Sequence, residues 1–387
     1  MSYKVIITIA SKAKSLLFSK ERRYQYLSNL QKRLYFVLLK RYAVNSKKAM
    51  ALRLLSHGRD IFKDYSLTKS NLRDIEKIWY GFNVDTDWFK FFNAISRERD
   101  RVFDARYVPM DFSYAYLHPY YNDTKAAEVI DDKNWYDLMF KGFLMPRTIC
   151  RIIQGIIMDA DYKTITMDEA SSKIKKAGGI IKPADISTFK GGGGGIHFVT
   201  DADDVAHILK QYDNCVVQEV LKQHEALAYL HKNSLNTIRM VTLNDENGAQ
   251  MLGAVVRMGV GGNRVDNASK GGIFCGIHDD GRLMKYAYNR KGDMYERHPD
   301  GAVFEKCIVP NYERCIEIVK ELSHRFVKVA RLVAWDLAIR EDGEPVIIEG
   351  NMPYSGIDLI QITKGPLFGE RTSEIVSKIK KDLNLSN

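Results

Sequence analysis

Two apolar runs near the end of the chain, LVAWDLAI and PVIIEGN, are joined by REDGE within residues 332–351. Asp-Gly between two such runs is the strongest short-range signal of a β-hairpin. In the first run Asp336 alternates with bulky residues, which puts its side chain on the opposite face of the strand. In the second run we expect Ile347, Glu349 and Asn351 to share a face. The chain must therefore build a β-sheet that contains this hairpin.

The hairpin brings two carboxylates together. With Asp342-Gly343 as a two-residue loop, Asp336 lies directly opposite Glu349, unless Pro345 shifts the pairing. Cross-strand partners have Cβ atoms about 5 Å apart, so two buried like charges repel each other unless a cation lies between them. Two carboxylates with the amide oxygen of Asn351 suit Mg²⁺ better than zinc. A hairpin with solvated charges is the alternative, but the apolar surroundings of Glu349 favour a metal site.

Length and composition indicate a globular protein. A chain of 387 residues can bury a sizeable core and should form two or three domains. Its five cysteines are scattered and never spaced as metal-binding pairs, which indicates a reducing compartment rather than a disulfide framework or a zinc site. No apolar run approaches the roughly 20 residues of a membrane span. We therefore expect a cytoplasmic protein.

Positive charge is concentrated at the N-terminus. Residues 1–63 hold 15 Lys and Arg against only Glu21 and Asp60. Such a module could bind an anionic membrane surface, an acidic glycan or nucleic acid, or could simply be a solvated set of helices. Because no nucleic-acid-binding motif is present, nucleic acid is not an expected partner. Peripheral association of residues 1–63 with the inner membrane face stays open.

The pattern of elements predicts three parts. Apolar residues recur at helical spacing over residues 21–62 and 71–92, and prolines and aromatics then interrupt the pattern. The aromatic residues of the second stretch are expected to form core. We predict a basic, mainly helical module at residues 1–110, a second part at 111–221 with a flap at about 175–221, and a third part at 222–387 with the metal site.

A glycine-rich loop lies between two strand-like runs. GGIIKPA carries Lys182, and DISTFKGGGGG follows it with Lys190 and five glycines before the run IHFVT. Glycines let backbone N–H groups approach a phosphate without obstruction. A Rossmann or P-loop turn would lead into a helix, whereas this loop leads into a strand. A flexible linker is the alternative, but the flanking strands and the two lysines favour a flap over a phosphate.

Several polar residues stand out in apolar strands. NCVVQEVL ends in Gln218 and Glu219, and His224 follows as either a ligand contact or an ordinary surface histidine. Arg239 and Arg257 each interrupt an apolar strand. A buried arginine needs an anionic partner, which is either a carboxylate of the protein or a bound phosphate.

The order of these features resembles the ATP-grasp superfamily over roughly residues 130–360. The features are a lysine strand, a glycine-rich flap, a Gln-Glu strand end, an arginine strand, Asn with Gly-Gly, and Asp with Glu-x-Asn on a hairpin. SLNTIRMVTL, VVRMGVGGNRVDNASKGGI and WDLAIREDGEPVIIEGN are most similar to the branch called sugar-transfer associated ATP-grasp. The resemblance implies an α+β fold in which two α+β subdomains with mostly antiparallel sheets clasp ATP, preceded here by a helical module.

The resemblance also implies roles for individual residues. Arg257 and Asn267 would contact the terminal phosphate, with Arg239 as a further catalytic residue. The metal ligands would be Asp336, Glu349 and Asn351. The nucleotide contacts would be Lys133, Lys182, Lys190, Gly192, Gly193, Gly194, Gln218, Glu219, Val220, Leu221 and His224.

The implied activity is ligation with ATP and Mg²⁺. A substrate carboxylate would attack the γ-phosphate to form an acylphosphate and ADP, and an amine would then displace phosphate. The branch name suggests amidation of an acidic sugar with an amino acid or amine in surface-polysaccharide (capsule) biosynthesis. The alternatives are an ATP-grasp phosphotransferase and a non-catalytic nucleotide-binding assembly protein.

Overall fold

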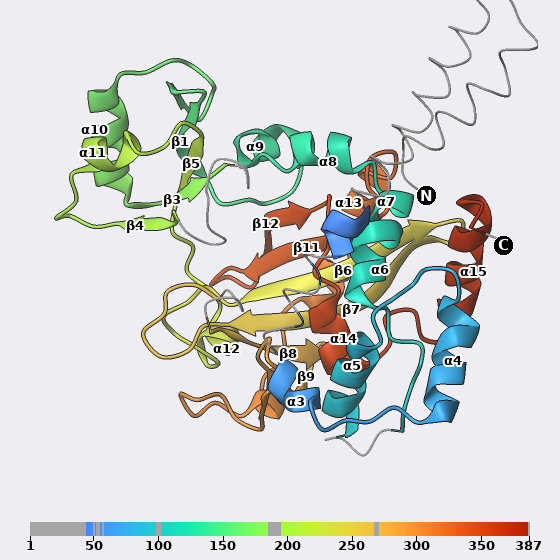
Figure 1. Cartoon of the computed structure of the whole chain (residues 1–387). Helices are drawn as coiled ribbons and strands as arrows, with labels where there is room; N and C mark the ends of the chain where they lie inside the picture. The colour runs from blue at the N-terminus through green and yellow to red at the C-terminus, as the bar shows by residue number, and fades with distance from the viewer. Residues whose placement is uncertain are drawn as a thin grey trace, which may run out of the picture.

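Two antiparallel β-sheets form the framework of the protein (Figure 1). The computed structural model describes residues 44–48, 51, 55, 58–97, 102–184, 195–266 and 271–385. Among these, the smaller sheet has the strand order β2-β1-β5-β3-β4 and the larger sheet the order β10-β9-β8-β7-β6-β11-β12. In Figure 1 the smaller sheet stands to one side of the larger one, and α8 and α9 lie between them.

The smaller sheet is covered by two helices on one face. Its apolar side chains form one core with α10 (Met167–Ala177) and α11 (Val205–Leu209). A capping box begins α10: the Thr166 side chain accepts from the Glu169 N–H, and Glu169 accepts from the Thr166 N–H at 2.7 Å. The strands are β1 (Thr148–Ile153), β2 (Ile156–Asp159), β3 (Gly179–Pro183), β4 (His197–Val199) and β5 (Cys215–Gln218).

The larger sheet is buried on both faces. Every residue of its strand β11 (Leu332–Ile339) is buried, because α13 (Tyr312–Arg325) covers one face while α14 (Asp358–Lys364), α15 (Thr372–Asp382) and the N-terminal helices cover the other. Its other strands are β6 (Thr237–Asp245), β7 (Gly248–Met258), β8 (Ile273–Ile277), β9 (Leu283–Tyr288), β10 (Met294–Tyr295) and β12 (Pro345–Asn351).

The N-terminal helices pack on the larger sheet. The aromatic residues predicted as core are buried together with Phe274 and Tyr288 of the sheet, apart from Tyr80, which is exposed. The described helices of this region are α3 (Arg59–Phe62), α4 (Lys69–Trp79), α5 (Asp87–Arg97), α6 (Met110–Phe112), the π-helix η1 (Ser113–Leu117) and α7 (His118–Tyr121). Helices on both sides of residue 110 share this core, and the three-part division stays a prediction.

Three short elements connect the N-terminal helices to the smaller sheet. They are α8 (Thr124–Ile130), the 3₁₀-helix η2 (Lys133–Trp135) and α9 (Tyr136–Met139). Asp132 caps η2 by accepting from the Asn134 N–H at 2.9 Å, which fixes the start of the turn that carries Lys133.

The hairpin of β11 and β12 confirms one prediction and corrects two others. Asp336 pairs directly with Glu349, as predicted. The loop, however, has three residues, because Arg340 and Glu344 are already hydrogen-bonded to each other. A bulge at Ile348 then shifts the register by one residue. Ile347 therefore packs into the core on the α13 side and does not share a face with Glu349.

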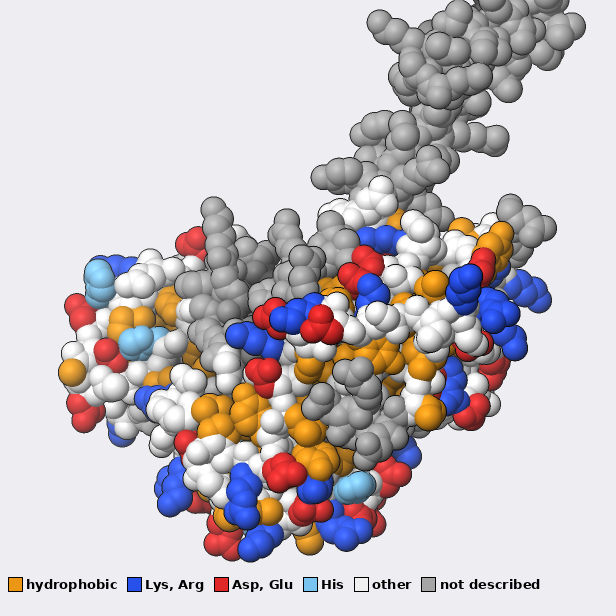
Figure 2. Space-filling view, turned by 60° about the horizontal axis from the view of Figure 1, so that its bottom comes forward, with side chains coloured by type: hydrophobic (Ala, Val, Ile, Leu, Met, Phe, Trp, Pro, Cys, Tyr) orange, Lys and Arg blue, Asp and Glu red, His pale blue; other side chains and the backbone are white. Residues whose placement is uncertain are grey.

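The surface carries charges of both signs. Figure 2 shows Lys and Arg side chains interspersed with Asp and Glu on the face that it presents, without a continuous basic surface. Most of residues 1–63, whose association with an anionic membrane the sequence leaves open, lie outside the described residues. Among the helices that the structure describes, none has both the length and the apolar character of a membrane span.

Candidate active site

Asp336 is the centre of a buried cluster of charges. Arg239 lies opposite it on β6 and donates two hydrogen bonds to its carboxylate, from Nε to Oδ1 at 2.8 Å and from Nη2 to Oδ2 at 2.7 Å. Arg257 Nη2 lies 3.1 Å from Oδ2, and the Asn351 amide donates to the same oxygen at 3.3 Å. Burial alone would raise the pKa of Asp336, but the two arginines hold it below its ordinary value. Asp336 is therefore a carboxylate despite being 1% exposed.

Glu349 has a partner from outside the sheet. Lys133 of η2 reaches it, with Nζ 2.8 Å from Oε1. Burial opposes both charges, yet the pKa of Lys133 is raised, chiefly by Glu349, and Lys133 holds the pKa of Glu349 below its ordinary value. Asp131 lies close by, where burial and the charge of Glu349 raise its pKa to about 7. Lys133 and Glu349 therefore form an ion pair across the boundary between η2 and the larger sheet.

Lys182 approaches the cluster from the smaller sheet. It lies on β3 and donates to Gln218 Oε1 of β5 at 3.2 Å. Burial, and then the charge of Lys133, lower the pKa of Lys182 to about 8, against the opposing effect of Glu349 and Asp266. Both sheets thus bring charged side chains to this region.

Arg257 also contacts groups that the sequence analysis did not select. Its Nε and Nη2 donate to Thr237 Oγ1 at 3.0 and 2.7 Å, and Nη2 lies 3.4 Å from Asp266 Oδ2. Asp266 in turn accepts from the Thr237 N–H at 3.2 Å. Asp266 stands directly before Asn267, which the sequence does single out.

The segment after β5 is partly occupied by internal contacts. The Glu219 carboxylate accepts from the Arg147 N–H at 3.0 Å and lies 3.4 Å from Arg147 Nε. His224 Nδ1 accepts from the Ala226 N–H at 3.1 Å and so caps α12 (Glu225–Ala228). Val220 is exposed, and the Leu221 N–H has no partner among the described residues. The predicted nucleotide contacts Lys190, Gly192, Gly193 and Gly194 and the predicted phosphate contact Asn267 lie outside the described residues.

Comparison with known proteins identifies the family. A model for sugar-transfer associated ATP-grasp proteins matches residues 112–377. The chain belongs to this family. The predicted α+β ATP-grasp fold is therefore confirmed, with antiparallel sheets and a helical N-terminal region. No curated protein sequence matches the chain.

Solved structures of ATP-grasp ligases are similar to the chain, at low identity. PsnB complexed with minimal precursor is 10% identical, with a TM-score of 0.37 over 67% of this chain and 64% of that one. D-alanyl-alanine synthetase A from Vibrio cholerae is 13% identical, with a TM-score of 0.38 over 67% and 66%. D-alanine-D-alanine ligase from Coxiella burnetii is 7% identical, with a TM-score of 0.40 over 68% and 62%. The chain spans less than two thirds of the length of each.

The donor set of this ATP-grasp site fits Mg²⁺. Mg²⁺ usually binds one or two carboxylates together with waters and substrate phosphates, rather than a cage of protein ligands. Among the described residues no group of three or more Asp, Glu, His or Cys side chains is placed to hold a metal ion. Asn351 Nδ2 donates to Ala334 O and Asp336, so its Oδ1 stays available as an acceptor. Asp336, Glu349 and Asn351 are thus the residues that would hold the ion.

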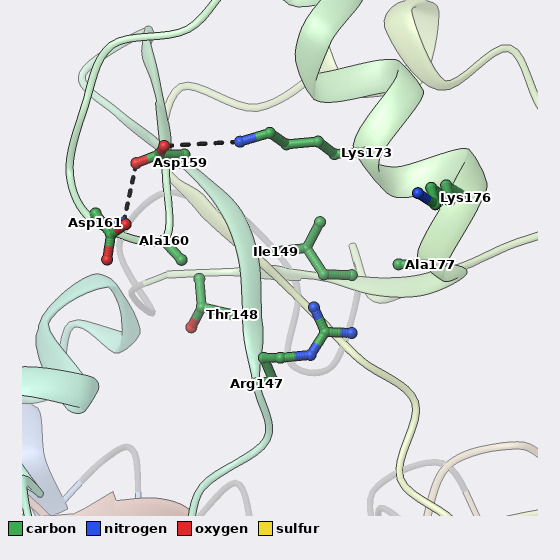
Figure 3. A pocket seen from close by; sticks show the side chains of 9 residues that line it. All are labelled: Arg147, Thr148, Ile149, Asp159, Ala160, Asp161, Lys173, Lys176 and Ala177. Carbon is green, nitrogen blue, oxygen red and sulfur yellow. Dashed lines mark hydrogen bonds and ion pairs between the residues drawn. The ribbon is translucent and has the colours of Figure 1, made fainter.

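A separate cavity lies on the smaller sheet of the ATP-grasp fold (Figure 3). It has a volume of about 520 Å³ and contains none of the predicted site residues. Lys173 on α10 and Asp159 face each other across it, with Nζ 3.6 Å from Oδ2. The cavity is lined by Arg147, Thr148, Ile149, Asp159, Ala160, Asp161, Lys173, Lys176 and Ala177.

Proposed function

We propose that the protein is an ADP-forming, ATP-dependent carboxylate–amine ligase that amidates an acidic sugar with an amino acid or amine during surface-polysaccharide (capsule) assembly. One observation carries this proposal: Lys133, Arg239 and Arg257 converge with Asp336 and Glu349 in one buried cluster. Membership of the sugar-transfer associated ATP-grasp family supports both the nucleotide and the sugar.

The balance of charges supports binding of a triphosphate. Lys133, Lys182, Arg239 and Arg257 bring four basic groups to the site, against Asp336, Glu349 and Asp266. Each of these three carboxylates lies beside a cation, whereas the described residues give Lys182 only the neutral side chain of Gln218 as a hydrogen-bond partner. Phosphate oxygens would take the lysine and arginine donors, while Mg²⁺ would occupy the carboxylates. The cluster therefore offers partners for both components of MgATP.

The first chemical step would be phosphoryl transfer to the substrate carboxylate. An oxygen of that carboxylate attacks the γ-phosphorus, the bond between phosphorus and the β,γ-bridging oxygen breaks, and ADP leaves. Arg257 and Arg239 would stabilise the negative charge on the transferred group, since buried guanidinium donors need no reorganisation during the reaction. When bound, Mg²⁺ supplies charge neutralisation on the phosphates.

The second step would release phosphate. The amine nitrogen attacks the acyl carbon, the bond from that carbon to the phosphate oxygen breaks, and the nitrogen loses a proton, which yields an amide. This chemistry needs no protein nucleophile. The cysteines support that view, because all five are buried and burial raises the pKa of Cys150 to about 12 and that of Cys307 to about 11.

Product analysis tests the proposal. We expect incubation with ATP, Mg²⁺, a uronic acid and an amino acid to yield ADP, phosphate and an amide. Release of AMP would contradict the acylphosphate route, and a phosphorylated acceptor formed without amine would identify a phosphotransferase instead.

Variants test the site. Asp336→Asn and Glu349→Gln should each abolish turnover, whereas Asp279→Asn, at a 99% exposed side chain on a surface turn, should not change it. Activity retained in both site variants would refute the metal assignment.

A further inference from the structure

The sheet face that carries Asp336 continues toward the N-terminal helices. Arg257 pairs with Phe274 and Phe274 with Tyr288 across three strands, so these side chains follow one row on that face. Phe274 and Tyr288 belong to the core shared with the N-terminal helices. Arg290 comes two residues after Tyr288, in the turn that follows β9. This arginine therefore lies where the charged cluster meets the N-terminal helices.

Two tyrosines face each other next to this arginine. The rings of Tyr114 and Tyr354 have centroids 5.5 Å apart, and each lies within about 6 Å of the His118 ring. His118 is buried and holds the loop after Asn351, because its Nε2 accepts from the Ser355 N–H at 2.8 Å. Neither tyrosine hydroxyl makes a hydrogen bond among the described residues. The pair thus offers two ring surfaces and two hydroxyl groups beside the metal ligands.

Arg290 has spare capacity for an anion. Its nearest acid is Asp358, with Oδ2 4.0 Å from Nε, and Nε is buried without a hydrogen-bond partner among the described residues. The pKa of Tyr114 is raised to about 12 by burial and by Asp358, against the opposing effect of Arg290 and Arg239. Tyr114 is therefore a protonated donor within electrostatic reach of both arginines. Of these, Arg239 already gives two of its five N–H donors to Asp336.

A lysine from the N-terminal module completes the group. Lys48 anchors residues 44–48 by donating to Phe82 O at 2.8 Å and Asn83 O at 2.7 Å. Lys47, beside it, places its ammonium 4.2 Å from the centroid of the Tyr354 ring. It has no ion-pair partner in the described part of the chain. The module thus presents one cation to the same tyrosine pair.

We propose that Tyr114, Tyr354, Arg290 and Lys47 form the acceptor subsite for a sugar that carries a carboxylate, a uronic acid. The sugar ring would lie against the tyrosines and bond their hydroxyls, while its carboxylate pairs with Arg290 and Lys47. Arg290 and Lys47 bring two cations to this group, and the carboxylate that the described residues place beside Arg290 is that of Asp358, so the subsite favours an acidic over a neutral sugar. This subsite rests on the proposed function, because it names the substrate class of the same active site. It also gives the N-terminal module a role in substrate recognition.

Binding of small probes to the full chain tests the subsite. With Mg²⁺ and saturating AMPPNP, titrations by calorimetry would compare D-glucuronate, D-glucose and acetate. We expect D-glucuronate to bind more tightly than either of the others. Arg290→Gln should weaken D-glucuronate binding about tenfold or more, as for loss of a charge-assisted pair, and leave D-glucose unchanged. Tyr354→Ala should weaken the binding of both sugars, and Lys47→Met should weaken the binding of D-glucuronate alone.

Controls separate this subsite from the nucleotide site. Arg290→Lys keeps the charge but loses the planar fork, so it should bind D-glucuronate more weakly than the unmodified chain and more tightly than Arg290→Gln. Arg282→Gln, at an exposed turn, should change nothing. Equal binding of D-glucose and D-glucuronate, or unchanged D-glucuronate binding by Arg290→Gln, would overturn the subsite while AMPPNP binding persists. Failure of the unmodified chain to bind AMPPNP would instead overturn the proposed function.

Discussion

Replacing Arg239 should destabilise the protein because Asp336 cannot reach water. The two side chains are 10% and 1% exposed and meet at 2.7 Å. Removing one partner of a buried ion pair typically costs about 3–5 kcal/mol, because the other charge stays buried. Here Arg257 at 3.1 Å and Asn351 at 3.3 Å still contact the carboxylate. We therefore expect Arg239→Gln to lower the free energy of unfolding by roughly 2–4 kcal/mol.

A matched pair on the surface gives the control. Arg282 and Asp280 also meet at 2.7 Å, but their side chains are 63% and 50% exposed. Exposed pairs are screened by solvent, so Arg282→Gln should leave stability unchanged. Urea unfolding followed by circular dichroism at pH 7.5 measures both variants. Equal effects of the two substitutions would refute the reasoning, because only burial distinguishes the pairs.

A double variant and the pH dependence sharpen this test. Arg239→Gln combined with Asp336→Asn also removes the buried negative charge that the first substitution leaves without its main partner. The double variant should therefore lose less free energy of unfolding than the two single variants together, by at least about 1 kcal/mol. The folded state holds the pKa of Asp336 below its ordinary value. The stability from the pair is therefore present above about pH 4 and lost as the pH falls through the lower folded pKa. The difference in the free energy of unfolding between Arg239→Gln and the unmodified protein should therefore decrease as the pH falls below about 4.

Three further outcomes follow from single residues. The pKa of Lys182 is about 8, so kcat/KM for ATP should fall as the pH rises through about 8. Lys182→Arg should keep kcat/KM high to a higher pH. Identical pH profiles of kcat/KM for the variant and the unmodified protein would exclude Lys182 as a phosphate contact. Gly343 has φ +88°, so Gly343→Ala should lower the unfolding free energy by about 1 kcal/mol and Gly343→Asn by less. The pKa of His118 is lowered by burial from 6.5 to about 4. As the pH falls, the unfolded state therefore takes up a proton before the folded state does. The free energy of unfolding should decrease by on the order of 3 kcal/mol as the pH falls from 6.5 to 4, and His118→Gln should make this pH dependence weaker.

The hairpin shows how far sequence patterns reach. Alternation correctly puts Asp336 on the face opposite Trp335 and directly across from Glu349. The predicted two-residue loop is wrong, yet Asp336 still pairs with Glu349. The extra loop residue and the bulge at Ile348 shift the register by one residue each, in opposite directions. Val346, Ile347 and Ile348 are all apolar, and a run of this kind carries no period that could reveal a bulge.

The partners of charged groups were harder to predict. The sequence required an anion for Arg239 and left open whether it was a carboxylate or a phosphate, and the structure gives the carboxylate of Asp336. Asp266 was not selected, because its closeness to Arg257 depends on the fold and not on any local pattern. Propensity and periodicity describe neighbours along one element, whereas these contacts join elements far apart in sequence.

One face of β11 serves both packing and chemistry. Leu332 and Ala334 pair with Leu243 and Val241 of β6, and all four lie in the core beneath the N-terminal helices. The next position on the same face is Asp336, opposite Arg239. The change from apolar to charged side chains thus occurs within one two-residue step, at the point where Lys133 of η2 meets Glu349. Asp336 stands on β11, which is paired on both sides, and Glu349 stands opposite it on the edge strand β12. Strands fix such carboxylates more firmly than a loop could, which the proposed transfer of a phosphoryl group between two positioned substrates requires.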